Sequence, residues 1–309
     1  MIYRGFLLSK IHNPRLPNQT AHVRMRGTLT PVKTSMHPVF KRSSRTTLPA
    51  ICLLALLCSG YLCVDFASPA IAKRTLRVMT YNIHVGVGMD KRLDLKRIAD
   101  VINHEHPDLV GLQEVDRGVK RTEGKDEIGE LAAMTHMDYA FAHNLDYQGG
   151  QYGVAILSRF LIQKIDHQKF ENKREAERRG MIRVEVEIDG RKVNFVTTHL
   201  DYQYEDGRVF ETEQLLRFLD GLKGPLIVVG DLNDEPAGGA YKLMLTKFTD
   251  AWPGGRAKGD GLSYPADKPA KRIDYIFYGI ADGVRAKKAS LVNTLASDHL
   301  PVVAELELR

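Results

Sequence analysis

The sequence predicts a mixed α/β domain in which β-sheets are covered by helices. Strand-like apolar segments alternate with amphipathic helical segments in the first part of the chain, and strand-like segments follow one another in the middle. This succession favours a layered α/β architecture. No linker, repeat or low-complexity tract follows Lys73, and 43% of all residues are hydrophobic, which is enough for a large core. We therefore expect residues 73–309 to form one domain.

Two strands and two helices are predicted in the first part of this domain. Residues 75–83 and 107–115 are apolar runs of strand length. Residues 126–135 predict a short helix. Residues 93–106 predict a longer one with Asp94 as N-cap, because apolar residues recur every three or four positions. The apolar face of this longer helix consists of Leu95, Ile98, Val101 and Ile102.

Strands dominate the rest of the chain. Residues 181–188 alternate polar and apolar side chains, so we expect one face of that strand to contact water. Residues 209–222 predict an amphipathic helix, because their apolar side chains recur at helical spacing. The other predicted strands comprise residues 152–159, 192–200, 225–233, 272–278 and 300–308.

Residues 1–72 have the features of a leader that precedes the domain. The basic segment Lys41–Arg45 is followed by an apolar run, and an Ala-x-Ala site ends at Ala72. This order is typical of a secretory signal peptide, so we expect cleavage after Ala72 and export to the periplasm or the exterior. An uncleaved membrane anchor is the alternative, because the apolar run is nearly long enough to span a bilayer.

The leader also accounts for the basic character of the chain. The net charge is +6, from 44 basic and 38 acidic residues, and residues 1–72 contain nine of the former and one of the latter. Residues 73–309 therefore carry 35 basic and 37 acidic residues, a net charge of −2. This removes a whole-surface electrostatic argument for binding a nucleic-acid duplex. All three cysteines also lie in the leader, so the domain needs no disulfide.

Polar residues gather where the predicted strands end or begin. Ligand sites of α/β proteins lie at such strand ends. Four carboxylates brought together there cannot all be ionised without a cation. Oxygen donors without cysteine suit Mg²⁺, Mn²⁺ or Ca²⁺, and such an ion suits a phosphate substrate because it polarises a phosphoryl oxygen. The gathered residues are Asn82, His84, Gln113, Glu114, His199, Asp231, Asn233, Asp274, Ser297, Asp298 and His299.

Seven short motifs occur in an order that is specific, although each motif alone is weak. They are TYNIH, LVGLQEV, YGVAILSR, TTHLD, VVGDLND, KRIDYIFY and SDHLPVVAEL. Together they resemble the endonuclease/exonuclease/phosphatase superfamily, which includes pancreatic deoxyribonuclease, inositol polyphosphate phosphatases and bacterial sphingomyelinases. The resemblance covers residues 76–309. It implies a four-layer α/β sandwich, with two mixed β-sheets packed face to face and helices on the outer faces.

The resemblance also implies roles for the gathered residues. Glu114 looks like the principal Mg²⁺ ligand, and Asp298 resembles a further residue of the metal site. Asp231 is similar to the residue that orients or deprotonates the attacking water. Asn233 and Asn82 resemble the amides that hold this aspartate and the phosphate.

The histidines have implied roles as well. Asp274 and His299 resemble a carboxylate–imidazole pair, in which the acid raises the pKa of the ring so that it binds or protonates a phosphate oxygen. His199 resembles a second histidine that contacts the scissile phosphate or serves as acid for the leaving group. Some members pair that histidine with a glutamate. No counterpart of that glutamate is evident in this sequence, and Tyr152 lies near the position from which it would come.

Independently of the resemblance, residues 172–180 are rich in arginine, which binds phosphate in a bidentate manner, so we expect Arg179 near the site. A solvated loop of mixed charge is the alternative, because Glu171, Glu175 and Glu177 offset the bases.

These observations predict a divalent-metal-dependent hydrolase of phosphoester bonds, of the phosphodiesterase type, which uses an in-line water attack. The substrate would be a small molecule, a lipid headgroup or a nucleic acid, and no stable protein partner is implied. An extracytoplasmic nuclease is the first alternative, although the domain has no basic stripe with interleaved aromatic residues. The second is a metal- and phosphate-binding module that has the fold without turnover.

Overall fold

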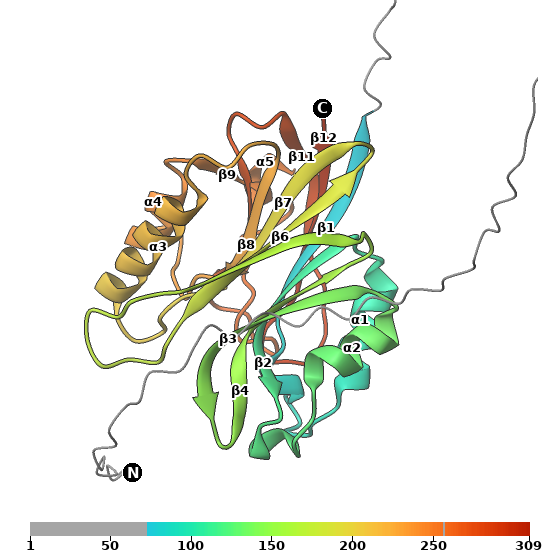
Figure 1. The fold of residues 1–309 in the computed structure, drawn as a ribbon, viewed down its shortest axis with the longest axis vertical. Helices are drawn as coiled ribbons and strands as arrows, with labels where there is room; N and C mark the ends of the chain where they lie inside the picture. The colour runs from blue at the N-terminus through green and yellow to red at the C-terminus, as the bar shows by residue number, and fades with distance from the viewer. Residues whose placement is uncertain (1–72, 256) are drawn as a thin grey trace, which may run out of the picture. The chain divides into compact units, whose positions relative to one another are not determined.

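The computed structural model describes residues 73–255 and 257–309 (Figure 1). The predicted leader, with its signal or anchor segment, lies outside the described residues. Within them, no helix has both the length and the apolar character that a membrane crossing requires. The described chain forms two six-stranded sheets.

The first sheet combines strands from both ends of the domain. The two chain segments meet where β1 pairs with β12 in antiparallel register, Arg74 opposite Leu308 and Thr80 opposite Val302. In spatial order its strands are β11 (Val284–Leu291), β12 (Val302–Leu308), β1 (Arg74–Asn82), β2 (Leu109–Arg117), β4 (Gly150–Ser158) and β3 (Asp138–Tyr147).

The second sheet is built from the middle of the chain and has the same pattern of strand directions. In each sheet the third and fourth strands run parallel, β1 with β2 and β7 with β8, and all other neighbours are antiparallel. Its strands, in spatial order, are β5 (Ile162–Lys169), β6 (Gly180–Ile188), β7 (Arg191–His199), β8 (Leu226–Asp231), β10 (Asp274–Gly279) and β9 (Phe248–Asp250).

Each parallel pair is connected by a helix, as parallel strands require. Helix α1 (Leu95–Glu105) joins β1 to β2, and α3 (Glu205–Leu219) joins β7 to β8. The remaining helices are short. They are α2 (Glu127–Thr135), α4 (Gly239–Met244), α5 (Ala251–Gly254) and the 3₁₀ turns η1 (His84–Gly86) and η2 (Lys120–Thr122).

Helix α1 begins where the sequence predicts. The Asp94 side chain accepts hydrogen bonds from the backbone N–H groups of Lys96 and Arg97, so it caps the helix as expected. Leu95 and Ile102 are buried on the predicted apolar face. Helix α3 begins at Glu205, four residues before the predicted start at residue 209.

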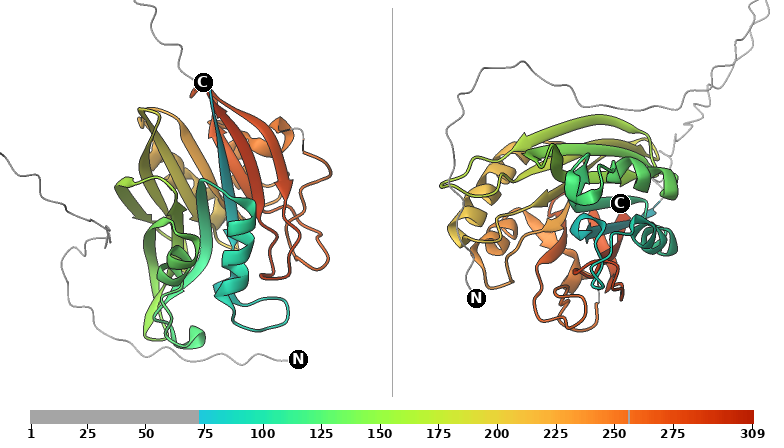
Figure 2. Two further views of the ribbon diagram at one scale, coloured as in Figure 1. Left: turned by 90° about the vertical axis from the view of Figure 1, so that its right-hand side faces the viewer. Right: turned by 90° about the horizontal axis from the view of Figure 1, so that it is seen from below.

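The sheets and helices form four layers, so the predicted sandwich is confirmed. One apolar core lies between the sheets and contains Leu76 of β1 and Phe195 of β7. A second core joins the outer face of the first sheet to α1 and α2, and a third joins the outer face of the second sheet to α3 and α4. Figures 1 and 2 show these helices on opposite outer faces.

The two sheets approach each other closely at Gly111 of β2. A Cβ atom there would overlap the Val229 side chain and would lie 2.7 Å from Thr197 Oγ1. Beside it, buried Gln113 Nε2 donates hydrogen bonds to Thr197 Oγ1 at 2.7 Å and to Thr80 Oγ1 at 3.1 Å. A polar bridge therefore fixes the sheets against each other just below the strand ends.

Two expectations about strands need correction. Of the β6 side chains that the alternation predicts to face water, only Glu185 and Glu187 reach solvent, because Arg183 is buried. Its guanidinium pairs with Asp166 of the neighbouring β5 and donates to Asn194 Oδ1 at 2.8 Å. The strands that the sequence did not predict are β3, β5, β9 and β11, and these are the four sheet edges.

A buried glutamate fixes the end of one strand in each parallel pair. Glu127 of α2 accepts a hydrogen bond at 2.7 Å from the backbone N–H of Asp116, near the end of β2. Glu211 of α3 accepts a hydrogen bond at 2.7 Å from the backbone N–H of Asp201, just after β7. Burial raises the pKa of Glu127 from 4.5 to about 8 and that of Glu211 to about 7.

We predict that Glu127→Gln makes folding stability less dependent on pH. The pKa of Glu127 is higher in the folded chain than its ordinary 4.5, so the folded state binds the proton more tightly. Its contribution to stability is complete below pH 4.5 and is lost as pH rises to about 8. Urea unfolding between pH 5 and 8 should show a smaller fall in the variant. Glu213→Gln, an exposed acid of α3, is the control, and equal pH slopes in wild type and Glu127→Gln would contradict the assignment.

Candidate active site

Three predicted site residues lie in one row across the second sheet. His199 of β7 is paired with Asp231 of β8, and Asp231 is paired with Asp274 of β10. On the other side of His199 the row continues to Gly180 of β6, which places Arg179 beside it. Strand register thus brings residues that are distant in sequence to one sheet edge.

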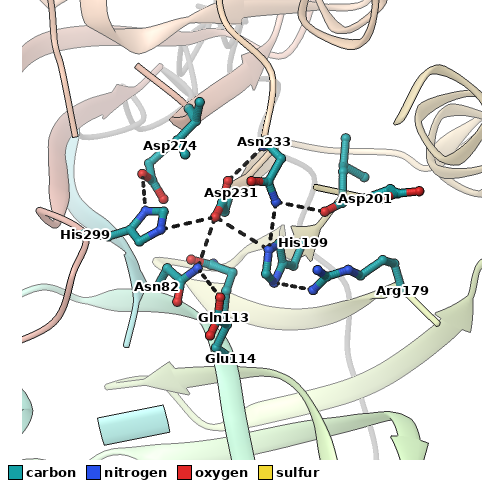
Figure 3. A network of polar contacts seen from close by, with 12 residues as sticks. Asn82, Gln113, Glu114, Arg179, His199, Asp201, Asp231, Asn233, Asp274 and His299 are labelled. Atoms are coloured by element: carbon teal, nitrogen blue, oxygen red, sulfur yellow. Dashed lines mark hydrogen bonds and ion pairs between the residues drawn. The ribbon is translucent and has the colours of Figure 1, made fainter. Parts of the chain in front are cut away.

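Asp231 stands at the centre of the site and is buried (Figure 3). Its Oδ2 accepts a hydrogen bond from Asn82 Nδ2 at 3.0 Å, and its Oδ1 accepts one from the backbone N–H of Asn233 at 2.8 Å. The Nε2 atoms of His199 and His299 lie 3.5 and 3.7 Å from Oδ2. Burial, followed by the charge of Asp274, raises the pKa of Asp231, and the charge of His299 opposes this rise.

Asp274 and His299 form the predicted carboxylate–imidazole arrangement. His299 Nδ1 lies 2.9 Å from Asp274 Oδ2, which also accepts a hydrogen bond from Ser263 Oγ at 2.6 Å. The Tyr264 ring packs on the imidazole, with 4.7 Å between ring centroids. Burial lowers the pKa of His299, but the charges of Asp274 and Asp231 outweigh it and raise the pKa to about 10. The ring is therefore an imidazolium at neutral pH, with Nε2 toward Asp231.

The first sheet contributes Asn82 and Glu114 from the ends of its parallel pair. Asn82 Nδ2 donates to Glu114 Oε1 as well as to Asp231, each at 3.0 Å, so one amide ties the two sheets together at the site. Glu114 has a φ of +55°, a left-handed conformation, at an irregularity in the pairing of β2 with β4. Such bulges redirect side chains. Here Gln113 is buried, whereas Glu114 lines the cleft.

Asp298 and His84 complete the rim on the side of the first sheet. Ser297 Oγ donates to the backbone oxygen of Asn82 at 2.7 Å and so ties the loop of Asp298 to the end of β1. His84 Nδ1 lies 3.0 Å from Val87 O and 3.7 Å from Asp298 Oδ1. His84 therefore has a local structural bond and also lines the cleft.

The donor set is compatible with a hard divalent cation. Glu114 and Asp298 both line the cleft, and Glu114 Oε1 is paired only with the Asn82 amide, with no ion pair to any described basic residue. Asp231, Asp274 and His299 also place ligand atoms within 4.8 Å of one another. In this second cluster the His299 imidazolium already offsets the carboxylate charge.

His199 is buried between two nitrogen donors. Arg179 Nη1 lies 2.8 Å from its Nδ1, and Asn233 Nδ2 lies 3.0 Å from its Nε2. Burial, followed by the charges of Arg179 and His299, lowers the pKa of His199 well below its ordinary value, so the ring is neutral. The residue that contacts Nδ1 of this histidine is therefore an arginine. Tyr152 lines the cleft nearby.

The site opens into a cleft of about 1450 Å³ whose lining is mostly polar. Six of the eight predicted site residues reach its surface, and Asn82 and Asp274 lie behind them in hydrogen bonds to Asp231 and His299. Sequence reasoning missed Ser263, Tyr264 and the buried glutamates, because nothing near them in sequence marks a site. The charged lining beyond the centre includes Arg121, Arg178, Arg208, Lys271, Glu175, Glu177, Glu205, Asp234 and Glu235.

The sequence model of the Endonuclease/Exonuclease/phosphatase family matches residues 79–299, which is most of the chain. The chain belongs to this family. All eight predicted site residues lie within the matched range. The resemblance inferred from the seven motifs is therefore confirmed.

Two curated proteins and one solved structure are similar to this chain. The uncharacterized protein YbhP of Escherichia coli K12 is 27% identical over 249 residues, which cover 76% of this chain and 97% of YbhP. A neutral sphingomyelinase candidate of Caenorhabditis elegans is 27% identical over 248 residues, 71% of this chain and 51% of that protein. The mannosyl-6-phosphatase of Bacteroides thetaiotaomicron shares the fold, with a TM-score of 0.62 at 18% identity, over 75% of this chain and 99% of that one.

We predict that Asp274→Asn lowers the pKa of His299. Removing one of two adjacent carboxylates while the ring stays buried should bring this pKa from about 10 to about 7–9. Titration of the imidazole resonances by NMR, in EDTA, measures it. Asp267→Asn, an exposed acid on the nearby loop, should leave the titration unchanged. An unaltered pKa in Asp274→Asn would mean that the pair does not set the charge of His299.

Proposed function

We propose that this family member hydrolyses phosphoester bonds, chiefly phosphodiesters, with a divalent cation and an in-line water. The placement of Asp231 carries the proposal. Its carboxylate is held by Asn82 and Asn233 at the floor of the cleft, with His299 and His199 beside it. A rigid carboxylate in such a position can accept a proton from a water aimed at phosphorus, and positioning supplies a large part of the rate.

The other site residues would bind the phosphoryl group and the cation. The imidazolium of His299 would bind a phosphoryl oxygen, since its Nε2 is free of Asp274 and faces Asp231. Glu114 and Asp298 would hold Mg²⁺ or Mn²⁺, which when bound polarises a phosphoryl oxygen. Asn82 would set the spacing between Glu114 and Asp231, because it bonds both.

The cleft favours a small polar phosphodiester or a lipid headgroup over a nucleic-acid duplex. Arg121, Arg178, Arg208 and Lys271 in its lining are offset by acids, and the domain has a net charge of −2. A duplex-binding groove would need an excess of basic residues. The mannosyl-6-phosphatase and the sphingomyelinase candidate point to phosphate esters of sugars and lipid headgroups.

We also propose that the domain acts outside the cytoplasm. The support is the order of basic segment, apolar run and Ala-x-Ala site in residues 1–72. N-terminal sequencing of the exported protein tests this. A chain that begins at Lys73 would support cleavage, and an intact leader on exported protein would support an anchor.

We predict that Asp231→Asn loses at least about 100-fold in kcat, because the amide cannot accept the proton of the water. Purified full-length protein in Mg²⁺ would be assayed with bis(p-nitrophenyl) phosphate, p-nitrophenyl phosphate and supercoiled plasmid. Glu235→Gln, an exposed carboxylate at the cleft rim, is the matched control. Full activity in Asp231→Asn would exclude its proposed role. Plasmid nicking that exceeds diester turnover would support the nuclease, and metal binding without any turnover would support the binding module.

We predict that Glu114→Gln weakens Mg²⁺ and Mn²⁺ binding at least about tenfold, because it removes the charge of a principal ligand. Isothermal titration of EDTA-stripped full-length protein measures this. The amide oxygen of the variant can still accept the hydrogen bond from Asn82, so the fold should be retained. The same Glu235→Gln control should bind as wild type does, and no binding by the wild type would remove the cation from the proposal.

A further inference from the structure

The surroundings of His199 contain more hydrogen-bond donors than acceptors. Arg179 Nη1 lies 2.8 Å from Nδ1, and Asn233 Nδ2 lies 3.0 Å from Nε2 while also donating to Leu200 O at 3.0 Å. Among the described residues, the nearest acceptor to the ring nitrogens is Asp231 Oδ2, 3.5 Å from Nε2. Figure 3 shows this chain of contacts from Arg179 through His199 to Asp231.

This arrangement fixes the tautomer of His199. A guanidinium can only donate, so Nδ1 must present its lone pair to Arg179. A neutral imidazole carries one N–H, which must then be at Nε2, on the side of Asp231 and the cleft. Asn233 Nδ2, 3.0 Å from Nε2, already donates a hydrogen bond to Leu200 O, so it does not require the lone pair of Nε2. A second proton could enter only at Nδ1, where it would break the contact with Arg179. The charged groups that face the ring are Arg179, His299 and Asp231.

One hydrogen-bond donor of Arg179 has no partner among the described residues. The Arg179 side chain is buried. Its Nη1 lies 2.8 Å from His199 Nδ1 and 3.0 Å from Glu177 Oε1, and its Nε has no partner among the described residues. The side chain nevertheless lines the cleft. Unpaired buried donors are costly unless a ligand satisfies them. On the cleft side of the ring, His199 Nε2 and Asn233 therefore form a donor pair whose natural complement is the oxygens of a phosphoryl group.

We propose that Arg179 is a positioning residue that holds His199 as the neutral Nε2–H tautomer, so that His199 donates a hydrogen bond to a non-bridging phosphoryl oxygen. His199 then does not protonate the leaving group. The catalytic part of this inference rests on the proposed phosphoester hydrolysis, whereas the tautomer does not. Of the two roles that the resemblance left open for His199, the geometry selects contact with the phosphate.

The tautomer is tested by NMR of the ¹⁵N-labelled full-length protein, with the His199 resonances assigned from their loss in His199→Gln. Wild type and Arg179→Lys should show Nε2 protonated and Nδ1 unprotonated. Arg179→Met should admit a proton at Nδ1. Arg174→Met, an exposed arginine of the same loop, should match wild type. Protonated Nδ1 in the wild type, or an unchanged ring in folded Arg179→Met, would overturn the proposal.

The role in turnover is tested by leaving-group dependence. A donor to a non-bridging oxygen should matter equally for bis(p-nitrophenyl) phosphate and diphenyl phosphate, whereas an acid matters more for the poorer phenol leaving group. His199→Ala should lose about 100- to 1,000-fold on both. His199→Gln, which keeps an N–H donor, should recover at least tenfold of this loss. Equal losses in Gln and Ala, or a larger loss on diphenyl phosphate, would overturn the proposal. If wild type turns over neither diester, the proposed function fails while the NMR result stands.

Discussion

The carboxylate of Asp231 is the group on which the rest of the site depends. Burying a charge costs several kcal/mol unless hydrogen bonds and opposite charges surround it. Asn82 and the backbone of Asn233 supply the hydrogen bonds, and His299 supplies the charge. Asp274 then balances His299 in turn. Each of these side chains therefore depends on a hydrogen bond or a charge from another. The partners come from both sheets and from chain segments far apart in sequence.

The topology explains how these segments meet. The two parallel pairs, β1 with β2 and β7 with β8, direct Asn82, Glu114, His199 and Asp231 to a common edge. The helix that follows one strand of each pair then fixes that strand end with a buried glutamate, Glu127 or Glu211. Repetition of one βαβ arrangement in two sheets therefore yields a site with Asn82 and Glu114 on one side and His199 and Asp231 on the other.

The sequence predicts the interior of this molecule better than its periphery. The eight strands with two neighbours each are apolar runs or, in β6, an alternation of polar and apolar residues, and both patterns are typical of strands. The edge strands β5 and β11 contain charged residues that protect an open edge, so their pattern resembles loops. The site residues could be located because Asp231 ends a buried strand, Glu114 lies near the end of a predicted one, and the motifs follow in order. The contact of Arg179 with His199 and the bond of Ser263 to Asp274 arise only in three dimensions, through the register of β6 with β7 and the return of a long loop.

The close approach of the sheets at Gly111 has a consequence for how the sequence can change. No side chain fits between β2 and Val229 there, so a larger residue would separate the sheets. The Asn82–Asp231 bond spans the same interface at its upper end. A larger residue at position 111 is therefore expected to disturb the Asn82–Asp231 bond, although Gly111 itself does not line the cleft. Insertions that enlarge the cleft would be tolerated only in the loops beyond the strand ends.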